Sequence, residues 1–305
     1  MFPLYLRKKF HSSFILIALI VLTSWSATAA SKVFPNAFPK AWINGVNCAT
    51  EAKGQVHQYD ENLFIIRQSV CTNFEAPFIY LLFGKNKVLM QDSGASDFGQ
   101  RQIVDNVIKQ WLIDNELNTI ELIVSHSHGH GDHVAGDSLF IDRPNTQIIG
   151  KDLDSVKRFF GFNHWPDGIY QLDLGGRRID ILPLPGHQDA HLALYDYETQ
   201  ILFTGDSLYP GRIYFKQENF GAFSQSMKKL YKYAQTKTVK HILGTHIEMT
   251  QQPGVDYPFT AKAHKNERKL ELTIQHLEQL VNWLPNAKLP VKKQVFDDFI
   301  LYPTN

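Results

Sequence analysis

Four histidines lie within eight positions of one segment, which reads SHSHGHGDH and ends at His133. Two registers of His-x-His are possible there. Only the register that starts at His128 places Asp132 two residues after its second histidine, His130, and another histidine directly after that aspartate. The frame is therefore H-x-H-x-D-H, and His126 lies outside it. Neutral imidazoles and carboxylates are suitable zinc ligands, so this segment predicts a metal site.

Three more side chains that can bind a metal follow later in the chain, each just after an apolar run typical of a strand. They are His187, Asp206 and His246. A histidine-rich surface loop is the alternative interpretation of the first cluster. Such a loop would explain neither Asp132 nor this ordered series, so the series favours a metal centre built from several strand ends.

The elements that would position these residues alternate between strands and helices. Short β-rich runs at 63–68, 78–83 and 87–91 predict a meander, because a Gly-Lys-Asn turn separates the last two. No proline- or glycine-rich linker interrupts the chain, so a single α/β domain with two sheets is the simplest architecture. Further strands are expected at 121–125, 146–150, 178–183, 192–195, 201–204 and 241–243, and helices at 98–115, 153–160, 223–234 and 265–284, the last docked near the C-terminal end.

The first thirty residues have the pattern of a secretory leader. Three basic residues at positions 7–9 precede an apolar run at 14–22 that is too short to span a bilayer comfortably, and the small residues Ala-Thr-Ala end at position 29. We therefore expect a signal peptide over 1–29, a mature domain over 30–305, and a periplasmic or secreted protein without a stable membrane span. An uncleaved N-terminal anchor is the alternative.

Composition and cysteine content fit an exported globular protein. Hydrophobic residues make up 44% of the chain, and 31 Lys and Arg stand against 30 Asp and Glu. These values exclude a disordered chain and give no basic excess for nucleic acid, so the expected partner is a small-molecule substrate, while the oligomeric state stays open. An oxidising compartment allows a disulfide between Cys48 and Cys71, with two buried free thiols as the alternative.

The ordered metal-binding residue types resemble the metallo-β-lactamase superfamily over about residues 64–246. Asp92-Ser93-Gly94 matches the acidic strand end of that family. The resemblance implies a four-layer αβ/βα sandwich with the metals at one edge of its two sheets. It also implies two zinc ions per chain, although these ligand types tolerate other divalent metals. The implied ligands are His128, His130 and His187 for the first ion, Asp132, His133 and His246 for the second, and Asp206 as a bridge between both.

The residue at the bridging position separates the subfamilies. β-Lactamases of the family usually have Cys or Ser where this chain has Asp206, whereas glyoxalase II-like thioesterases, lactonases and several esterases have Asp. The segment 203–209, FTGDSLY, and Pro185-Gly186-His187 with His191 four residues later look like the glyoxalase II pattern. Only 59 residues follow His246, whereas a glyoxalase II usually carries a longer helical glutathione-binding domain there. We therefore expect the catalytic apparatus of that group without its substrate domain.

The resemblance implies an exported dinuclear zinc hydrolase that attacks an ester, thioester or lactone carbonyl. Water bound to zinc can reach a pKa near 7, which makes a metal-bound hydroxide available as the nucleophile. Asp132 is the candidate catalytic residue, because it can orient that water or shuttle a proton. His126 and His191 are expected outside the ligand set, where outer contacts fix the ligands. Polar side chains within 209–214 are candidates for the substrate entrance, or for an ordinarily packed loop.

Three other activities use a similar ligand frame. A periplasmic β-lactamase fits the expected compartment but not Asp206. A phosphodiesterase uses the same metals, but no basic run for nucleic acid is present. A mononuclear-iron sulfur dioxygenase shares the H-x-H-x-D-H frame. Metal analysis distinguishes the dioxygenase from the zinc hydrolases, because the ligand types alone do not select between zinc and iron.

Overall fold

The computed structural model describes residues 1, 34, 36–259 and 261–305. The expected signal peptide falls outside this part of the chain, apart from its first residue. Among the helices of the described residues, none combines the length with the apolar character that crossing a membrane would require. The fold below is that of residues 34–305, which form one compact unit.

Six strands form the first sheet, and their spatial order is their order in the chain. The first four are antiparallel neighbours, which confirms the expected meander and adds one strand before it. The last three run parallel, so β4 and β5 end at the same edge of the sheet. The strands are β1 (Gly54–Gln58), β2 (Leu63–Gln68), β3 (Phe78–Phe83), β4 (Lys87–Gln91), β5 (Glu121–Ser125) and β6 (Thr146–Ile148).

The second sheet also has six strands, in the order β13-β12-β10-β9-β8-β7. Its strands are antiparallel except for β10 and β12, which run parallel and therefore end at the same edge. They are β7 (Tyr170–Asp173), β8 (Arg178–Pro183), β9 (Leu192–Asp196), β10 (Ile201–Gly205), β12 (His241–Gly244) and β13 (Glu271–Leu272). A small third sheet contains β11 (Arg212–Lys216), β14 (Gln294–Val295) and β15 (Ile300–Thr304).

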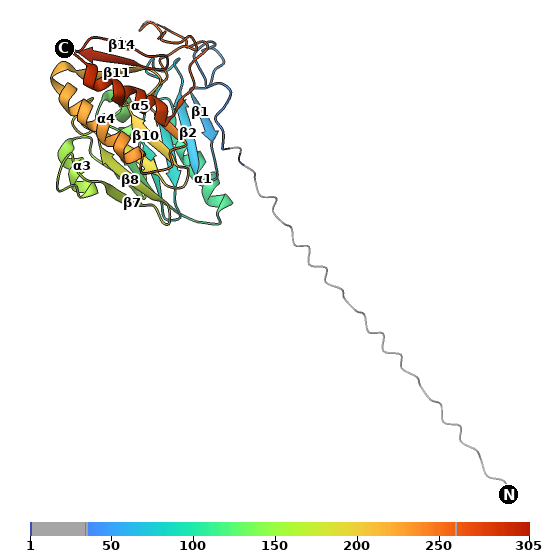
Figure 1. Ribbon diagram of the computed structural model, residues 1–305. Coiled ribbons are helices and arrows are strands. Elements are labelled where there is room, and N and C mark those ends of the chain that lie inside the picture. Colours follow the sequence, from blue (N-terminus) through green and yellow to red (C-terminus); the bar gives the residue numbers. More distant parts are fainter. Residues whose placement is uncertain (2–33, 35, 260) are drawn as a thin grey trace. The chain divides into compact units, whose positions relative to one another are not determined.

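Three long helices cover the outer faces of the two large sheets, whereas Val156 and Phe160 of the helix at 153–160 pack into the core between them. Val104 and Trp111 of α1 pack on the first sheet, whereas Phe223 of α4 and Leu277 of α5 pack on the second. Helices α4 and α5 lie side by side across the second sheet (Figure 1). The helices are α1 (Gln100–Asp114), α2 (Gly131–Val134), α3 (Leu153–Phe160), α4 (Phe220–Ala234) and α5 (Ile274–Trp283), with 3-10 turns at Asp137–Leu139, Gln217–Asn219 and Leu284–Asn286.

Alternation along the strands explains why both faces of each sheet are buried. In β3, Phe78 and Tyr80 point into the core between the sheets, while Ile79 and Leu81 point toward α1. The period of two in side-chain direction thus divides one apolar run between two cores. The layers are α1, the first sheet, the second sheet, and α4 with α5. This arrangement confirms the expected four-layer sandwich.

The helix expected over 265–284 is shorter in the structure, where α5 covers only Ile274–Trp283. Glu271 and Leu272 instead pair with the edge of β12 as β13. Thr273 then begins the helix: its side chain accepts from the backbone of His276, and the His276 side chain accepts from the backbone of Thr273. This capping box fixes the start of the helix. A strand pairing therefore replaces the first turns of the expected helix.

The two cysteines form a disulfide. The Cα atoms of Cys48 and Cys71 lie 5.4 Å apart, within the range that the bond requires. The alternative of two free thiols is therefore wrong for this structure. The bond ties the segment before β1 to the loop that connects β2 and β3.

Candidate metal centre

The predicted metal-binding residues all come from one edge of the two large sheets. Residues 126–133 follow β5, and the short helix α2 within them turns Asp132 and His133 toward the second sheet. His187 follows β8, while Asp206 and His246 follow the parallel pair β10 and β12. The structure thus brings all seven residues together, in two groups of three and four.

The first group consists of three imidazoles. His128 Nε2 lies 2.8 Å from His130 Nδ1. His187 Nε2 lies 3.1 Å from His128 Nε2 and 3.0 Å from His130 Nδ1. Two nitrogens bound to one tetrahedral zinc lie about 3.3 Å apart, so the spacing fits a common metal. Burial lowers the pKa of each of the three side chains below the usual value, which favours the neutral imidazole that a metal needs.

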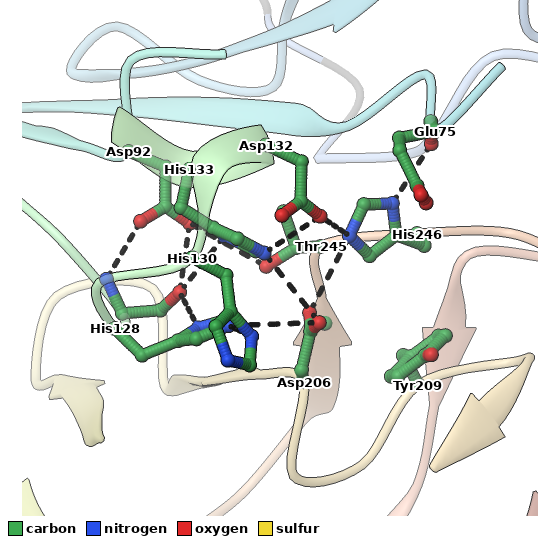
Figure 2. A network of polar contacts seen from close by, with 12 residues as sticks. Glu75, Asp92, His128, His130, Asp132, His133, Asp206, Tyr209, Thr245 and His246 are labelled. Carbon is green, nitrogen blue, oxygen red and sulfur yellow. Dashed lines mark hydrogen bonds and ion pairs between the residues drawn. The ribbon is translucent and has the colours of Figure 1, made fainter. Parts of the chain in front are cut away.

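The second group combines two carboxylates with two imidazoles. Asp132 Oδ2 lies 3.1 Å from His133 Nε2 and 3.2 Å from His246 Nε2. The two imidazole nitrogens and Asp206 Oδ1 are buried and have no hydrogen-bond partner within the described part of the chain. Such orphaned polar atoms are rare in proteins and call for an explanation. A cation bound by all four residues supplies one, so the residues fit a second metal (Figure 2).

The carboxylate of Asp206 lies between the two groups. Its Oδ2 is 3.9 Å from His128 Nε2 and 3.7 Å from His187 Nε2 in the first group. The same oxygen is 3.4 Å from His133 Nε2 in the second group, and Oδ1 is 3.5 Å from His246 Nε2. One carboxylate therefore reaches both groups, which is the geometry of a bridging ligand.

The charge of the second group differs from that of the first. Burial disfavours the cation of His246, but the carboxylates of Asp206 and Asp132 outweigh it and raise the pKa of His246 to about 10. Burial likewise acts against the His133 cation, yet Asp206, Asp92 and Asp132 hold its pKa well above the usual value. Burial disfavours both carboxylate anions of the group, but the histidines keep their pKa values below the usual range. The group therefore stabilises positive charge.

Outer contacts orient three of the histidines. The Nδ1–H groups of His187 and His246 donate to the backbone carbonyls of Tyr214 and Glu75, both at 2.8 Å. His133 Nδ1 lies 3.1 Å from Asp92 Oδ2. In each case the outer contact leaves Nε2 pointing into its group. Contacts of this kind fix the tautomer and the ring orientation of a metal ligand.

The remaining histidines of the motifs lie outside the two groups, as expected. His126 Nε2 is 2.8 Å from Asp137 Oδ1 and contacts neither group. His191 is buried, and its Nε2 accepts from the backbone N–H of Asp206 at 3.2 Å. His191 therefore positions the bridging residue through its main chain.

Sequence reasoning missed the contribution of the backbone. No residue type signals that the carbonyls of Glu75 and Tyr214 contact two histidines, because every residue has a carbonyl. In the segment 209–214, the buried Tyr209 hydroxyl donates to the Arg212 carbonyl, so Tyr209 is packed and does not form an entrance. Arg212 and Tyr214 do line a cavity. The entrance interpretation is therefore wrong for Tyr209 and stays a prediction for Arg212 and Tyr214.

Comparisons with known proteins agree with this geometry. A family model described as "Metallo-beta-lactamase superfamily" matches residues 72–246. A "Hydroxyacylglutathione hydrolase" of Prochlorococcus marinus (strain MIT 9312) is 29% identical over 133 residues, which are 37% of this chain and 54% of that protein. A protein of the same name from Aeromonas hydrophila is 27% identical over 137 residues, 45% of this chain and 48% of that protein. The chain spans about half the length of these relatives.

Solved structures share the fold at low sequence identity. "Metallo-beta-lactamase from Pontibacter korlensis" has a TM-score of 0.50 and 12% identity, and the match covers 76% of this chain and 99% of that one. "Crystal Structure of DIM-1 metallo-beta-lactamase" has a TM-score of 0.50 and 13% identity, with 77% and 99% covered. At these identities the likeness concerns the fold alone.

Proposed function

Because this chain belongs to the metallo-β-lactamase superfamily and is a metal-dependent hydrolase, we propose that it is an exported enzyme with two zinc ions that hydrolyses an ester, thioester or lactone. The observation that carries the proposal is the position of Asp206, whose carboxylate faces both ligand groups. The three imidazoles of one group and the four residues of the other are the proposed ligands of the two ions.

Divalent ions bound at the two groups would polarise the substrate carbonyl and lower the pKa of water between them. The residues of this chain would hold the ions and manage the proton. The side chain of Asp132 is 21% exposed, so one of its faces is open to solvent while its Oδ2 faces His133 and His246. We assign Asp132 the role of orienting the attacking water and accepting its proton.

The substrate class is inferred from the bridging residue and the relatives. An Asp at position 206 would hold two ions close together, whereas Cys would bind mainly one ion and Ser would not usually bridge. The two relatives with the name hydroxyacylglutathione hydrolase are 29% and 27% identical to parts of the chain. These observations support an acyl group that is transferred from sulfur or oxygen to water, and they disfavour a β-lactam as the main substrate.

Export is proposed from the leader pattern of residues 1–29 and from the disulfide. Disulfides persist in oxidising compartments and are rare in the cytosol, so the bond between Cys48 and Cys71 supports a periplasmic or secreted location. Fractionation of cells that express the full chain would test this. Recovery of an intact, uncleaved chain from the cytosolic fraction alone would contradict it.

Metal analysis and a substrate panel test the reaction. Protein covering residues 30–305, purified without chelator, is expected to hold about two zinc ions per chain. Its kcat/KM is expected to be higher on at least one ester, thioester or lactone than on any penicillin, cephalosporin or carbapenem. One tightly bound iron with the second group empty would favour a sulfur dioxygenase. Efficient β-lactam hydrolysis without activity on the panel would favour a β-lactamase.

The variant Asp206→Asn tests the bridge itself. Removing the bridging charge should lower the second-metal occupancy and kcat/KM together. We expect kcat/KM to fall by more than about 100-fold, beyond what the loss of an outer contact costs. A variant that keeps two metals and most of its activity would show that Asp206 does not bridge.

A further inference from the structure

A cavity of about 150 Å³ opens beside the two ligand groups. Two of its wall residues are the ones whose backbone carbonyls orient a histidine. Glu75 accepts from His246 of the second group, and Tyr214 accepts from His187 of the first. The cavity therefore adjoins both ligand groups. Its walls combine aromatic rings with charged groups: Phe74, Glu75, Arg212, Tyr214, Glu248, Tyr257, Pro258, Phe259, Ala261 and His264.

The guanidinium in the wall, Arg212, donates from each of its three nitrogens to the protein. Its Nε donates to Asp256 at 2.7 Å and one terminal nitrogen donates to Glu248 at 3.0 Å. The other terminal nitrogen donates to the backbone carbonyl of Tyr257. The same group lies over the ring of Phe259, 4.1 Å from its centroid. Each of the three nitrogens of Arg212 therefore already has an acceptor in the protein, and its charge is paired with two carboxylates.

The two carboxylates in the wall differ in their partners. Glu248 accepts from the backbone and side chain of Arg212 and from the Tyr209 hydroxyl. The carboxylate of Glu75 makes no hydrogen bond and no ion pair within the described part of the chain, and it lies beside His246 in Figure 2. The cavity consequently offers one carboxylate without a partner, whereas the positive charge of Arg212 is already paired with two carboxylates.

We propose that this cavity binds a substituted ammonium group of the substrate; this proposal rests on the proposed function, because it names the substrate class of the same centre. An ammonium group is attracted both to a carboxylate and to the faces of aromatic rings. The size is suitable, since a protein cavity of about this volume holds one benzene molecule. Phe74 and Phe259, 58% and 60% exposed, form an apolar rim through which such a group can enter.

The same features disfavour an anionic substrate group. A carboxylate of the substrate would approach Glu75, while Arg212 stays bound to Glu248 and Asp256. Like charges at close range, without a compensating cation, weaken binding.

Matched substrates test the proposal on metal-loaded protein covering residues 30–305. One pair places the charge on the leaving group: acetylthiocholine and its neutral isostere, the 3,3-dimethylbutyl thioacetate. The other pair places it on the acyl group: a 4-trimethylammoniobutanoyl thioester and the 5,5-dimethylhexanoyl thioester. We expect kcat/KM to favour the cation about tenfold in at least one pair, the factor that corresponds to roughly 1.4 kcal/mol.

Variants assign the preference to one carboxylate. Glu75→Gln keeps the backbone carbonyl that accepts from His246. This variant should reduce the ratio of kcat/KM between the cationic and the neutral substrate to about one. Glu75→Asp keeps a carboxylate and should retain part of the preference. The matched control is Glu61→Gln, the same change at an exposed position just before β2, whereas Glu75 lies in the loop after that strand. A ratio near one in both pairs for the parent protein, or an unchanged ratio in Glu75→Gln, would overturn the proposal.

A binding measurement separates failure of this inference from failure of the proposed function. If metal-loaded protein hydrolyses no member of the panel, the proposed function is wrong, and the cavity is judged by calorimetric titration with benzyltrimethylammonium. Binding that Glu75→Gln weakens about tenfold, with Glu61→Gln unchanged and equal metal content in all proteins, supports the ammonium site. Equal or absent binding in the parent and in Glu75→Gln rejects it.

Discussion

The two ligand groups of the metal centre lie side by side but differ in chemistry. One consists of imidazoles whose pKa values burial lowers, so it is neutral before any metal arrives. The other combines Asp132 and Asp206 with two histidines whose pKa values these carboxylates raise. The first group thus offers a metal ion only the lone pairs of imidazole nitrogens. The second group also offers the negative charge of its carboxylates. Their responses to mutation and to pH should differ accordingly.

The largest difference should appear when one ligand of the neutral group is removed. His128→Ala leaves only two imidazoles, so we expect loss of the first metal and a fall in kcat/KM of more than about 100-fold. The second metal should remain, because Asp132, His133 and His246 are untouched. Metal content by elemental analysis, together with kcat/KM, measures both effects.

The matched control is His126→Ala. His126 lies two residues earlier and pairs with Asp137 at 2.8 Å outside both groups. We expect this variant to retain two metals. Equal loss of the first metal in both variants would show that the frame set by Asp132 is wrong.

An intermediate effect is expected when only an outer contact of the charged group changes. In Asp92→Asn, His133 loses the carboxylate that lies 3.1 Å from its Nδ1. Loss of such a contact lowers metal affinity about 10- to 100-fold. The second metal should therefore dissociate at lower chelator concentration, while the first is retained. A chelator titration that removes both metals in parallel, as in the parent protein, would argue against separate control of the two groups.

The smallest effect concerns the pH dependence of metal-free protein. The pKa of His246 rises from 6.5 to about 10 on folding, so its protonated form stabilises the fold below pH 6.5, and this contribution is lost as the pH rises through about 10. The Tm of metal-free protein should fall over that interval. Zinc-loaded protein should show a smaller fall, because the metal replaces the proton. A Tm that stays level in metal-free protein, or an identical fall in His246→Gln, would exclude this role.

The sequence predicted the elements whose boundaries carry local signals. Helix α3 begins and ends where expected, since the Asp152 side chain caps its first turn and Gly161 ends it with a left-handed conformation. Strands β4, β5 and β8 match the expected ranges because turn residues bound each apolar run. The predicted start of α5 was wrong, because Glu271 and Leu272 form a strand before the helix begins. That strand depends on the pairing of Leu272 with Ile242, which lies 30 residues earlier in the chain.

The candidate site shows the same division between local and distant information. The frame from His128 to His133 is readable in a single segment, and the order of His187, Asp206 and His246 after apolar runs completes it. The outer carbonyls are different: Glu75 precedes its partner His246 by 171 residues and contributes only main-chain atoms. No residue type marks such a contact, so it becomes visible only once the two sheets are placed together.

The two carbonyl contacts have a consequence for how this enzyme can diversify. His246 and His187 are held by the main chain of Glu75 and Tyr214, while the side chains of these same residues line the cavity. Exchanging either side chain removes no hydrogen bond to a histidine. Substitutions at these two positions should therefore change substrate selectivity while the main-chain contacts to the metal-binding histidines stay in place. A library restricted to positions 75 and 214 offers a direct route to new selectivity.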